Sequence, residues 1–340
     1  MRTIEEIRAL SVIDPELNQL LKDGLTLPPA WTKNTDVHEV RALLKRMGGE
    51  MDPHGADGDV RVSTRDGASI AVRVHRPSKR ARDDGGRPGM LMLHGGGYSV
   101  GGLETGARLS DVFADLGGVA VNVDYRLAPE HAFPAPVEDA YDALTWVSEN
   151  LDTLGIDPSK GFIVAGESSG ANMALASTYL WETQNQDSPL NITGVYSSMS
   201  SGATAETVPE KYKHLFVSAE QNANAPVMST EAIERIKELY KPDPTSPLAY
   251  PIAIPDPSIM PPTYFQAAGL DPTRDCTLIM EQVWKDAGVP TKLDVYPGMP
   301  HVFWALGLPT TEQTKKHEVD TRDGLSWMLA WSGGIVYKKD

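Results

Sequence analysis

A serine lies at the centre of a pentapeptide with glycine at both ends, Gly166-Glu167-Ser168-Ser169-Gly170. The apolar run 162–165 comes directly before it and a segment rich in small residues follows, so we expect a strand that turns tightly into a helix. Such a turn needs little bulk around the serine and lifts its hydroxyl above the sheet. The pattern indicates that Ser168 is a nucleophile; the alternative is a glycine-rich turn with a capping serine.

Three consecutive glycines, in His94-Gly95-Gly96-Gly97-Tyr98, follow the apolar run 90–93. Backbone N–H groups in such a loop approach a developing oxyanion without obstruction by side chains. We therefore expect the N–H groups of Gly96, Gly97 and Ser169 to form an oxyanion hole, with Gly95 left open. A flexible loop is the alternative, but an aromatic residue closes this one directly.

A serine nucleophile of this kind needs a histidine base, and the chain order nucleophile, acid, base leaves His214, His301 and His317. His214 precedes any suitable acid. His317 lies between charged residues on a polar helix, so we expect it to be solvated. His301 follows the apolar run 292–296 and a turn, which places it at the carboxyl edge of the sheet beside Ser168. His301 is the predicted base.

The acid that orients the base should follow the strand expected at 263–268. Asp271 is the first carboxylate past that strand. Asp275 is better placed as the N-terminal cap of a helix over 275–287. Asp271 is the predicted acid, and Asp275 is the fallback.

The rest of the chain supplies elements that can position these residues. Residues 59–77 alternate apolar and polar side chains around Asp66-Gly67, which predicts a hairpin. Short apolar runs then alternate with helix-like segments, which predicts an α/β protein with a mostly parallel central sheet flanked by helices. The runs are 90–93, 119–123, 162–165, 192–196, 263–268 and 292–296, and the clearest helices are 135–150, 170–183 and 275–287.

Two parts of the chain fall outside this alternation. Residues 4–22 and 37–47 read as amphipathic helices, the first broken near Pro15, and we interpret 1–50 as N-terminal cap helices. Residues 202–258 contain one helix near 229–240 and then a proline-rich stretch, which indicates an inserted cap with a return linker. The catalytic core is then 58–201 and 259–336.

Composition narrows the choice of partners. The formal net charge of −15 argues against nucleic acid, because that binding depends on Lys and Arg. Cys276 is the only cysteine, which excludes an internal disulfide or a cysteine-based metal site. Acidic residues near the N-terminus disfavour a signal peptide, and no run reaches the ~20 apolar residues of a membrane span. We expect a cytoplasmic protein.

These motifs together resemble the hormone-sensitive-lipase-like family of α/β-hydrolases, over nearly the whole catalytic core. The matching segments are 94–98, 124–131 with Pro134, 166–170, 246–248, Asp271-Pro272 with Asp275, and 296–301. The resemblance implies an α/β-hydrolase fold with a helical cap, carboxylesterase activity on short- to medium-acyl esters, and often a homodimer. The chain departs from the family at Glu167 and Ser169, where Asp and Ala are usual, and at Val302, where Gly is usual.

The predicted function is hydrolysis of small-molecule esters, of acetyl type, through Ser168, His301 and Asp271, without metal or cofactor. Tyr98 and Phe303 are expected to wall an apolar substrate pocket. Three alternatives remain open. A binding protein that has lost catalysis is disfavoured because all three triad residues are present. An amidase or lactonase, and an acyltransferase that excludes water, use the same triad, and the sequence does not separate them.

Overall fold

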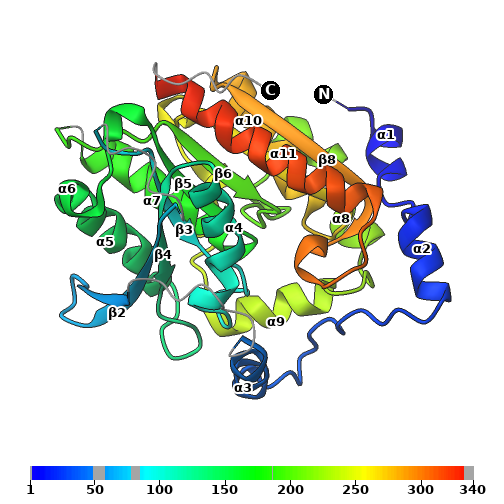
Figure 1. Cartoon of the computed structure of the whole chain (residues 1–340). Coiled ribbons are helices and arrows are strands. Elements are labelled where there is room, and N and C mark those ends of the chain that lie inside the picture. Colours follow the sequence, from blue (N-terminus) through cyan, green and yellow to red (C-terminus); the bar gives the residue numbers. More distant parts are fainter. Residues whose placement is uncertain (1, 49–57, 78–84, 186, 333–340) are drawn as a thin grey trace.

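The computed structural model describes residues 2–48, 58–77, 85–185 and 187–332. A single sheet of eight strands runs through it in the order β1-β2-β4-β3-β5-β6-β7-β8 (Figure 1). β2 is antiparallel to β1 and β4, and all the other neighbours are parallel. The strands are β1 (Asp59–Ser63), β2 (Ser69–His75), β3 (Gly89–Leu93), β4 (Val119–Asp124), β5 (Phe162–Glu167), β6 (Gly194–Ser198), β7 (Thr263–Leu270) and β8 (Thr291–Pro300). The predicted hairpin and mostly parallel sheet are confirmed.

Helices cover both faces of the sheet. α5 (Ala135–Glu149), α7 (Ser169–Gln184) and α10 (Arg274–Asp286) pack against one face, in a cluster that includes Leu91 and Val164. α4 (Leu103–Asp115) and α11 (Glu312–Leu329) pack against the other, with Met90 and Ile163. Successive residues of the same strands thus place their side chains in the two opposite layers of the core, as expected for a sheet that is buried on both faces.

The N-terminal residues form three helices, α1 (Ile4–Ala9), α2 (Pro15–Lys22) and α3 (Val37–Gly48). Pro15 opens α2, where its missing N–H costs nothing, and Asp14 caps that helix. The segment between α1 and α2 lies against the turn at the end of β8: Gly298 N donates to Leu10 O at 2.8 Å, and Asp14 N donates to Gly298 O at 3.2 Å. Ser11 Oγ also donates to Gly269 O in β7, at 3.3 Å. We call residues 10–14 the N-terminal strap.

The insert between β6 and β7 carries α8 (Ser218–Gln221) and α9 (Thr230–Tyr240), and its proline-rich part holds only short 3₁₀ turns, Pro251–Ala253 and Pro257–Ile259. Glu231 at the start of α9 accepts a hydrogen bond from Lys33 N, so the chain before α3 contacts the insert. The proposed cap boundaries remain predictions, and their end residues 1, 49–50 and 333–336 lie outside the described residues. No helix in the described ranges is long and apolar enough to cross a membrane.

Candidate active site

Ser168 occupies the sharp turn between β5 and α7, with φ 55° and ψ −120°. Its N–H donates to Ser198 O at 2.8 Å. A Cβ at Gly166 would lie 2.1 Å from Gly170 O, and one at Gly170 would lie 2.0 Å from Leu93 O, so neither position admits a side chain. This contact explains both glycines of the pentapeptide. The turn holds the serine in a backbone conformation that non-glycine residues rarely adopt, as functional sites often do.

Three side chains from three loops form one continuous hydrogen-bonded chain. Ser168 Oγ lies 2.8 Å from His301 Nε2, and His301 Nδ1 lies 2.6 Å from Asp271 Oδ2. All three residues are buried. A carboxylate only accepts, so Nδ1 carries the proton and Nε2 is left to accept from the serine hydroxyl. The residues predicted from the sequence as nucleophile, base and acid are therefore brought together.

The structure separates the two aspartates that the sequence left as alternatives. The Asp271 carboxylate faces His301 and accepts from both Thr273 N and Thr273 Oγ1 at 2.8 Å. Asn222 Nδ2, from the insert, donates to Asp271 O at 2.9 Å. No local sequence pattern pointed to Thr273 or Asn222 in this role.

Asp275 does not cap α10, because Thr273 occupies that position and Asp275 lies inside the first turn. Its buried carboxylate accepts from Arg274 Nε at 2.7 Å and from the backbone N–H groups of Val217 and Ser218 at 2.7 and 2.6 Å. The expected capping role is corrected: Asp275 ties α10 to the start of α8 instead.

The glycine-rich loop runs beside the serine turn with φ 125° at Gly96 and 59° at Gly97. Gly96 O accepts from Ser99 N at 3.1 Å and Val100 N at 3.0 Å, so the loop is an ordered turn rather than a flexible one. Ser169 is the first residue of α7, and the geometry of a helix leaves its N–H without an intrahelical acceptor.

His94 anchors this loop from below. Its ring stacks on Tyr125 with centroids 4.1 Å apart, and Tyr125 Oη donates to His94 O at 2.7 Å. Burial lowers the pKa of His94 to about 4, so the imidazole is neutral at physiological pH. The neutral ring donates from Nδ1 to Gly95 O at 2.7 Å, which fixes the first peptide of the loop.

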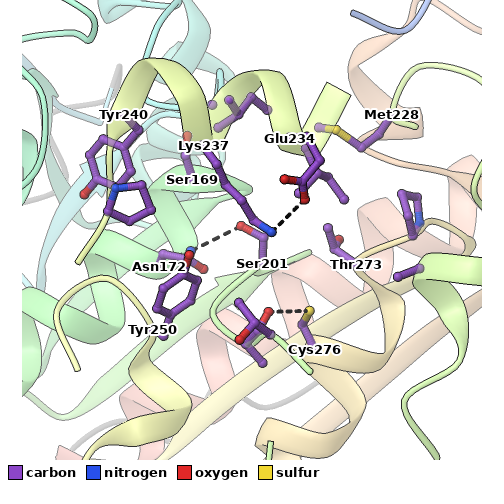
Figure 2. Close-up of a pocket in the computed structure, with 18 of the residues that line it drawn as sticks. Ser169, Asn172, Ser201, Met228, Glu234, Lys237, Tyr240, Tyr250, Thr273 and Cys276 are labelled. Atoms are coloured by element: carbon purple, nitrogen blue, oxygen red, sulfur yellow. Dashed lines mark hydrogen bonds and ion pairs between the residues drawn. The ribbon is translucent and has the colours of Figure 1, made fainter. Parts of the chain in front are cut away.

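Ser168 and His301 line a cavity. Figure 2 shows other residues of its wall, among them Asn172, Met228 and Tyr250. Its wall is mostly apolar and comes largely from the insert, including Phe216, Met228, Ile233 and Tyr250. None of its lining residues comes from the described part of the N-terminal helices. Tyr98 lines the cavity as predicted; its hydroxyl accepts from Asn172 Nδ2 at 2.7 Å.

One side of the cavity is polar. Figure 2 shows Lys237 extending from α9 towards Ser201, and its Nζ donates to Glu234 Oε1 at 2.8 Å. Ser201 Oγ in turn accepts from Asn172 Nδ2 at 3.2 Å. Burial raises the pKa of the Cys276 thiol to about 12, so this cysteine lines the cavity as an inert group.

Two aromatic side chains lie elsewhere than the sequence suggested. Phe303 is fully buried and packs with Leu17, Met199 and Tyr296, so it belongs to the core and does not line the cavity. His317, expected to be solvated, is also buried and stacks on Trp304 with centroids 4.0 Å apart. His317 shares a helix face with Thr321, Leu325 and Met328, and that spacing was the signal missed.

Comparison with known proteins agrees with this geometry. Residues 90–305 match the family described as alpha/beta hydrolase fold. The chain belongs to this family, and within it to the carboxylesterases.

Two curated relatives and one solved structure illustrate the likeness. The versiconal hemiacetal acetate esterase of Dothistroma septosporum is 33% identical over 302 residues, which cover 88% of this chain and 90% of that protein. Carboxylesterase NlhH of Mycobacterium tuberculosis is 33% identical over 317 residues, covering 88% of this chain and 92% of the relative. The crystal structure of vibralactone cyclase matches with a TM-score of 0.82 and a sequence identity of 28%. The match covers 96% of this chain and 97% of the cyclase chain.

Proposed function

We propose that the protein hydrolyses short-acyl esters of small molecules through an acyl-enzyme on Ser168. The observation that carries the proposal is the unbroken Asp271–His301–Ser168 hydrogen-bond chain, which ends on a strained turn and faces a cavity. The solved structure of a cyclase has a similar fold, so the fold alone does not decide the reaction.

In the proposed reaction His301 takes the hydroxyl proton as Ser168 Oγ attacks the ester carbonyl. Asp271 holds the imidazole in the required tautomer and stabilises the imidazolium. The N–H groups of Gly96, Gly97 and Ser169 are the proposed oxyanion donors, each worth roughly 3–4 kcal/mol in comparable sites. His301 then protonates the leaving alcohol, and water repeats the sequence to release the acid.

The cavity supports a preference for short acyl groups. The ammonium of Lys237 and the hydroxyl of Ser201 lie in the same wall, and a long hydrocarbon chain would desolvate them without replacing their hydrogen bonds. A relative of similar length is named as an acetate esterase, which agrees with this preference. Tyr98 is the proposed aromatic contact for the substrate.

The test is hydrolysis of a p-nitrophenyl ester series from acetate to decanoate. Ser168→Ala should abolish turnover, and Ser177→Ala, on the same helix with its hydroxyl bonded to Met173 O at 2.7 Å, should retain it. Activity should peak at short chains. No turnover of any ester by the wild type would sink the proposal and favour acyl transfer to an alcohol or ligand binding without catalysis. A peak at long chains would overturn only the acyl preference.

A further inference from the structure

We infer that Glu167 and Trp304 form a positioning pair that fixes the loop carrying His301 to the turn carrying Ser168. This inference rests on the proposed function, because Ser168 and His301 are its nucleophile and base. Neither member of the pair lines the cavity, so neither is a catalytic residue.

The pair joins two parts of the sheet that do not touch through their backbones. Ser168 follows β5 and His301 follows β8, and β6 and β7 lie between those strands. Trp304 Nε1 donates to Glu167 Oε1 at 3.1 Å. Glu167 directly precedes Ser168, and Trp304 lies three residues past His301 in the 3₁₀ turn Phe303–Ala305. One side-chain hydrogen bond thus links the residue directly before Ser168 to a residue three positions past His301.

The Glu167 carboxylate is itself held from a third element. Arg108 Nη2, on α4, donates to the same Oε1 at 3.2 Å. The Glu167 side chain is only 10% exposed, so its charge needs this partner. An oxygen that accepts from two donors on different elements has little freedom to move, and the negative charge of the carboxylate makes both hydrogen bonds stronger than bonds to a neutral acceptor.

The Trp304 ring is fixed in its plane as well. His317 on α11 stacks on it with an interplanar angle of 9°, and the Arg108 guanidinium lies 5.8 Å from its centroid. Burial, with the nearby charges of Arg108 and Lys316, lowers the pKa of His317 well below its ordinary value. The imidazole is therefore neutral and stacks on the indole without bringing a second cation beside Arg108.

The consequence for the reaction is geometric. The Ser168 Oγ–His301 Nε2 distance is 2.8 Å. The backbone N–H directly after His301, that of Val302, donates to a weak acceptor, Met199 Sδ, at 3.1 Å. Without the indole bond the 3₁₀ turn can shift and carry His301 with it. A misplacement of about 1 Å can cost about 100-fold in rate. Because the pair does not touch substrate, the loss should fall on kcat and spare KM.

The experiment is a double-mutant cycle on p-nitrophenyl acetate hydrolysis. Trp304→Phe keeps a ring against His317 and removes only the N–H, and Glu167→Met removes the acceptor. Each should lower kcat about 10-fold with KM changed less than about twofold, and the double variant should lose no more than either single. Glu167→Gln, which keeps an acceptor oxygen, should stay within about threefold of the wild type. Trp327→Phe on α11 is the matched control and should leave kcat unchanged.

A second readout does not depend on turnover. A p-nitrophenyl phosphonate should label Ser168: Oγ bonds to phosphorus, its proton passes to His301, and p-nitrophenolate leaves. The labelling rate should fall in Trp304→Phe as kcat does. Additive losses in the cycle, a loss confined to KM, or wild-type labelling by Trp304→Phe would overturn the positioning role. A wild type that is labelled but hydrolyses no ester would overturn the proposed function alone.

Discussion

Tyr98 of the glycine-rich loop and Tyr240 at the end of α9 stack face to face, with ring centroids 3.6 Å apart and planes 3° from parallel. Ile236, one turn earlier on α9, lies so close to Gly97 that a Cβ there would come within 2.8 Å of it. The insert therefore packs directly on the loop that carries the proposed oxyanion donors.

This contact predicts that truncating Tyr240 disturbs both stability and rate. Tyr240→Ala should cost about 3–5 kcal/mol of unfolding free energy, as for other large buried rings. It should also lower kcat for p-nitrophenyl acetate about 10-fold, because the loop loses its support. Tyr240→Phe is the matched control: its hydroxyl is buried with no partner among the described residues, so removing it should leave stability equal or higher. A normal kcat in folded Tyr240→Ala would show that the stack supports only the fold.

Substitution of Asp271 should mainly affect the rate, whereas substitution of Asp275 should mainly affect stability. Asp271→Asn should lower kcat about 10³–10⁴-fold while the melting temperature changes little, because the amide favours the wrong tautomer of His301. Asp275→Asn should instead cost about 3–5 kcal/mol of stability, since it leaves the fully buried Arg274 without its counter-charge. Thermal unfolding and initial rates on both variants check this. Equal effects on rate would contradict the assignment of Asp271 as the acid.

Burial of His94 predicts a loss of stability in mild acid. Its pKa is lowered to about 4 in the folded protein, against about 6.5 in an unfolded chain. Below about pH 6.5 this histidine is therefore protonated in the unfolded state but still neutral in the folded state, so stability falls as the pH is lowered to about 4. The free energy of unfolding, measured with urea, should be lower at pH 5.5 than at pH 7.5. This decrease should be about 1 kcal/mol smaller in His94→Gln than in the wild type.

Two other groups contribute to that pH dependence and make the variant necessary. His317 acts in the same direction, because its pKa is also lowered. Glu182 acts in the opposite direction, since burial raises its pKa to about 7 and the folded state takes up the proton first. The contribution of His94 is therefore obtained only by comparing the pH dependence of stability in the wild type and in His94→Gln. The same pH dependence in both proteins would refute the lowered pKa of His94.

The charge of Lys237 should restrict the acyl chain. Lys237→Met should raise kcat/KM for p-nitrophenyl octanoate relative to acetate by about 5–10-fold, because the chain then meets a methyl group instead of an ammonium. Lys213→Met is a matched control within the insert: Lys213 also pairs with a glutamate three residues earlier, but it does not line the cavity. An unchanged ratio would show that Lys237 is not in the path of the acyl group.

The sequence predicted most of the elements and the identity of the three linked residues. The serine turn was recognisable because Gly166 and Gly170 are required by backbone contacts within a few residues and with the adjacent strand. His301 and Asp271 followed from the order of strands along the chain. These features depend on local patterns, which a sequence displays directly.

What the sequence did not reveal depends on contacts between distant segments. Asp275 reads as a cap because nothing local shows Val217 and Ser218 approaching it from the insert. Phe303 reads as a pocket residue because it follows His301 closely, yet a left-handed residue, Val302, turns the chain and directs it into the core. His317 was judged by its charged neighbours, although a helix buries residues by face and not by adjacency.

The N-terminal strap has a practical consequence for anyone who handles this chain. Residues 10–14 bond to Gly298, three residues before His301, and to Gly269, two residues before Asp271. An N-terminal affinity tag or truncation that displaces this segment would loosen the loops that carry Asp271 and His301, while Ser168 would stay in place. Low specific activity in such a preparation would therefore result from the altered N-terminus and not from a poorly chosen substrate.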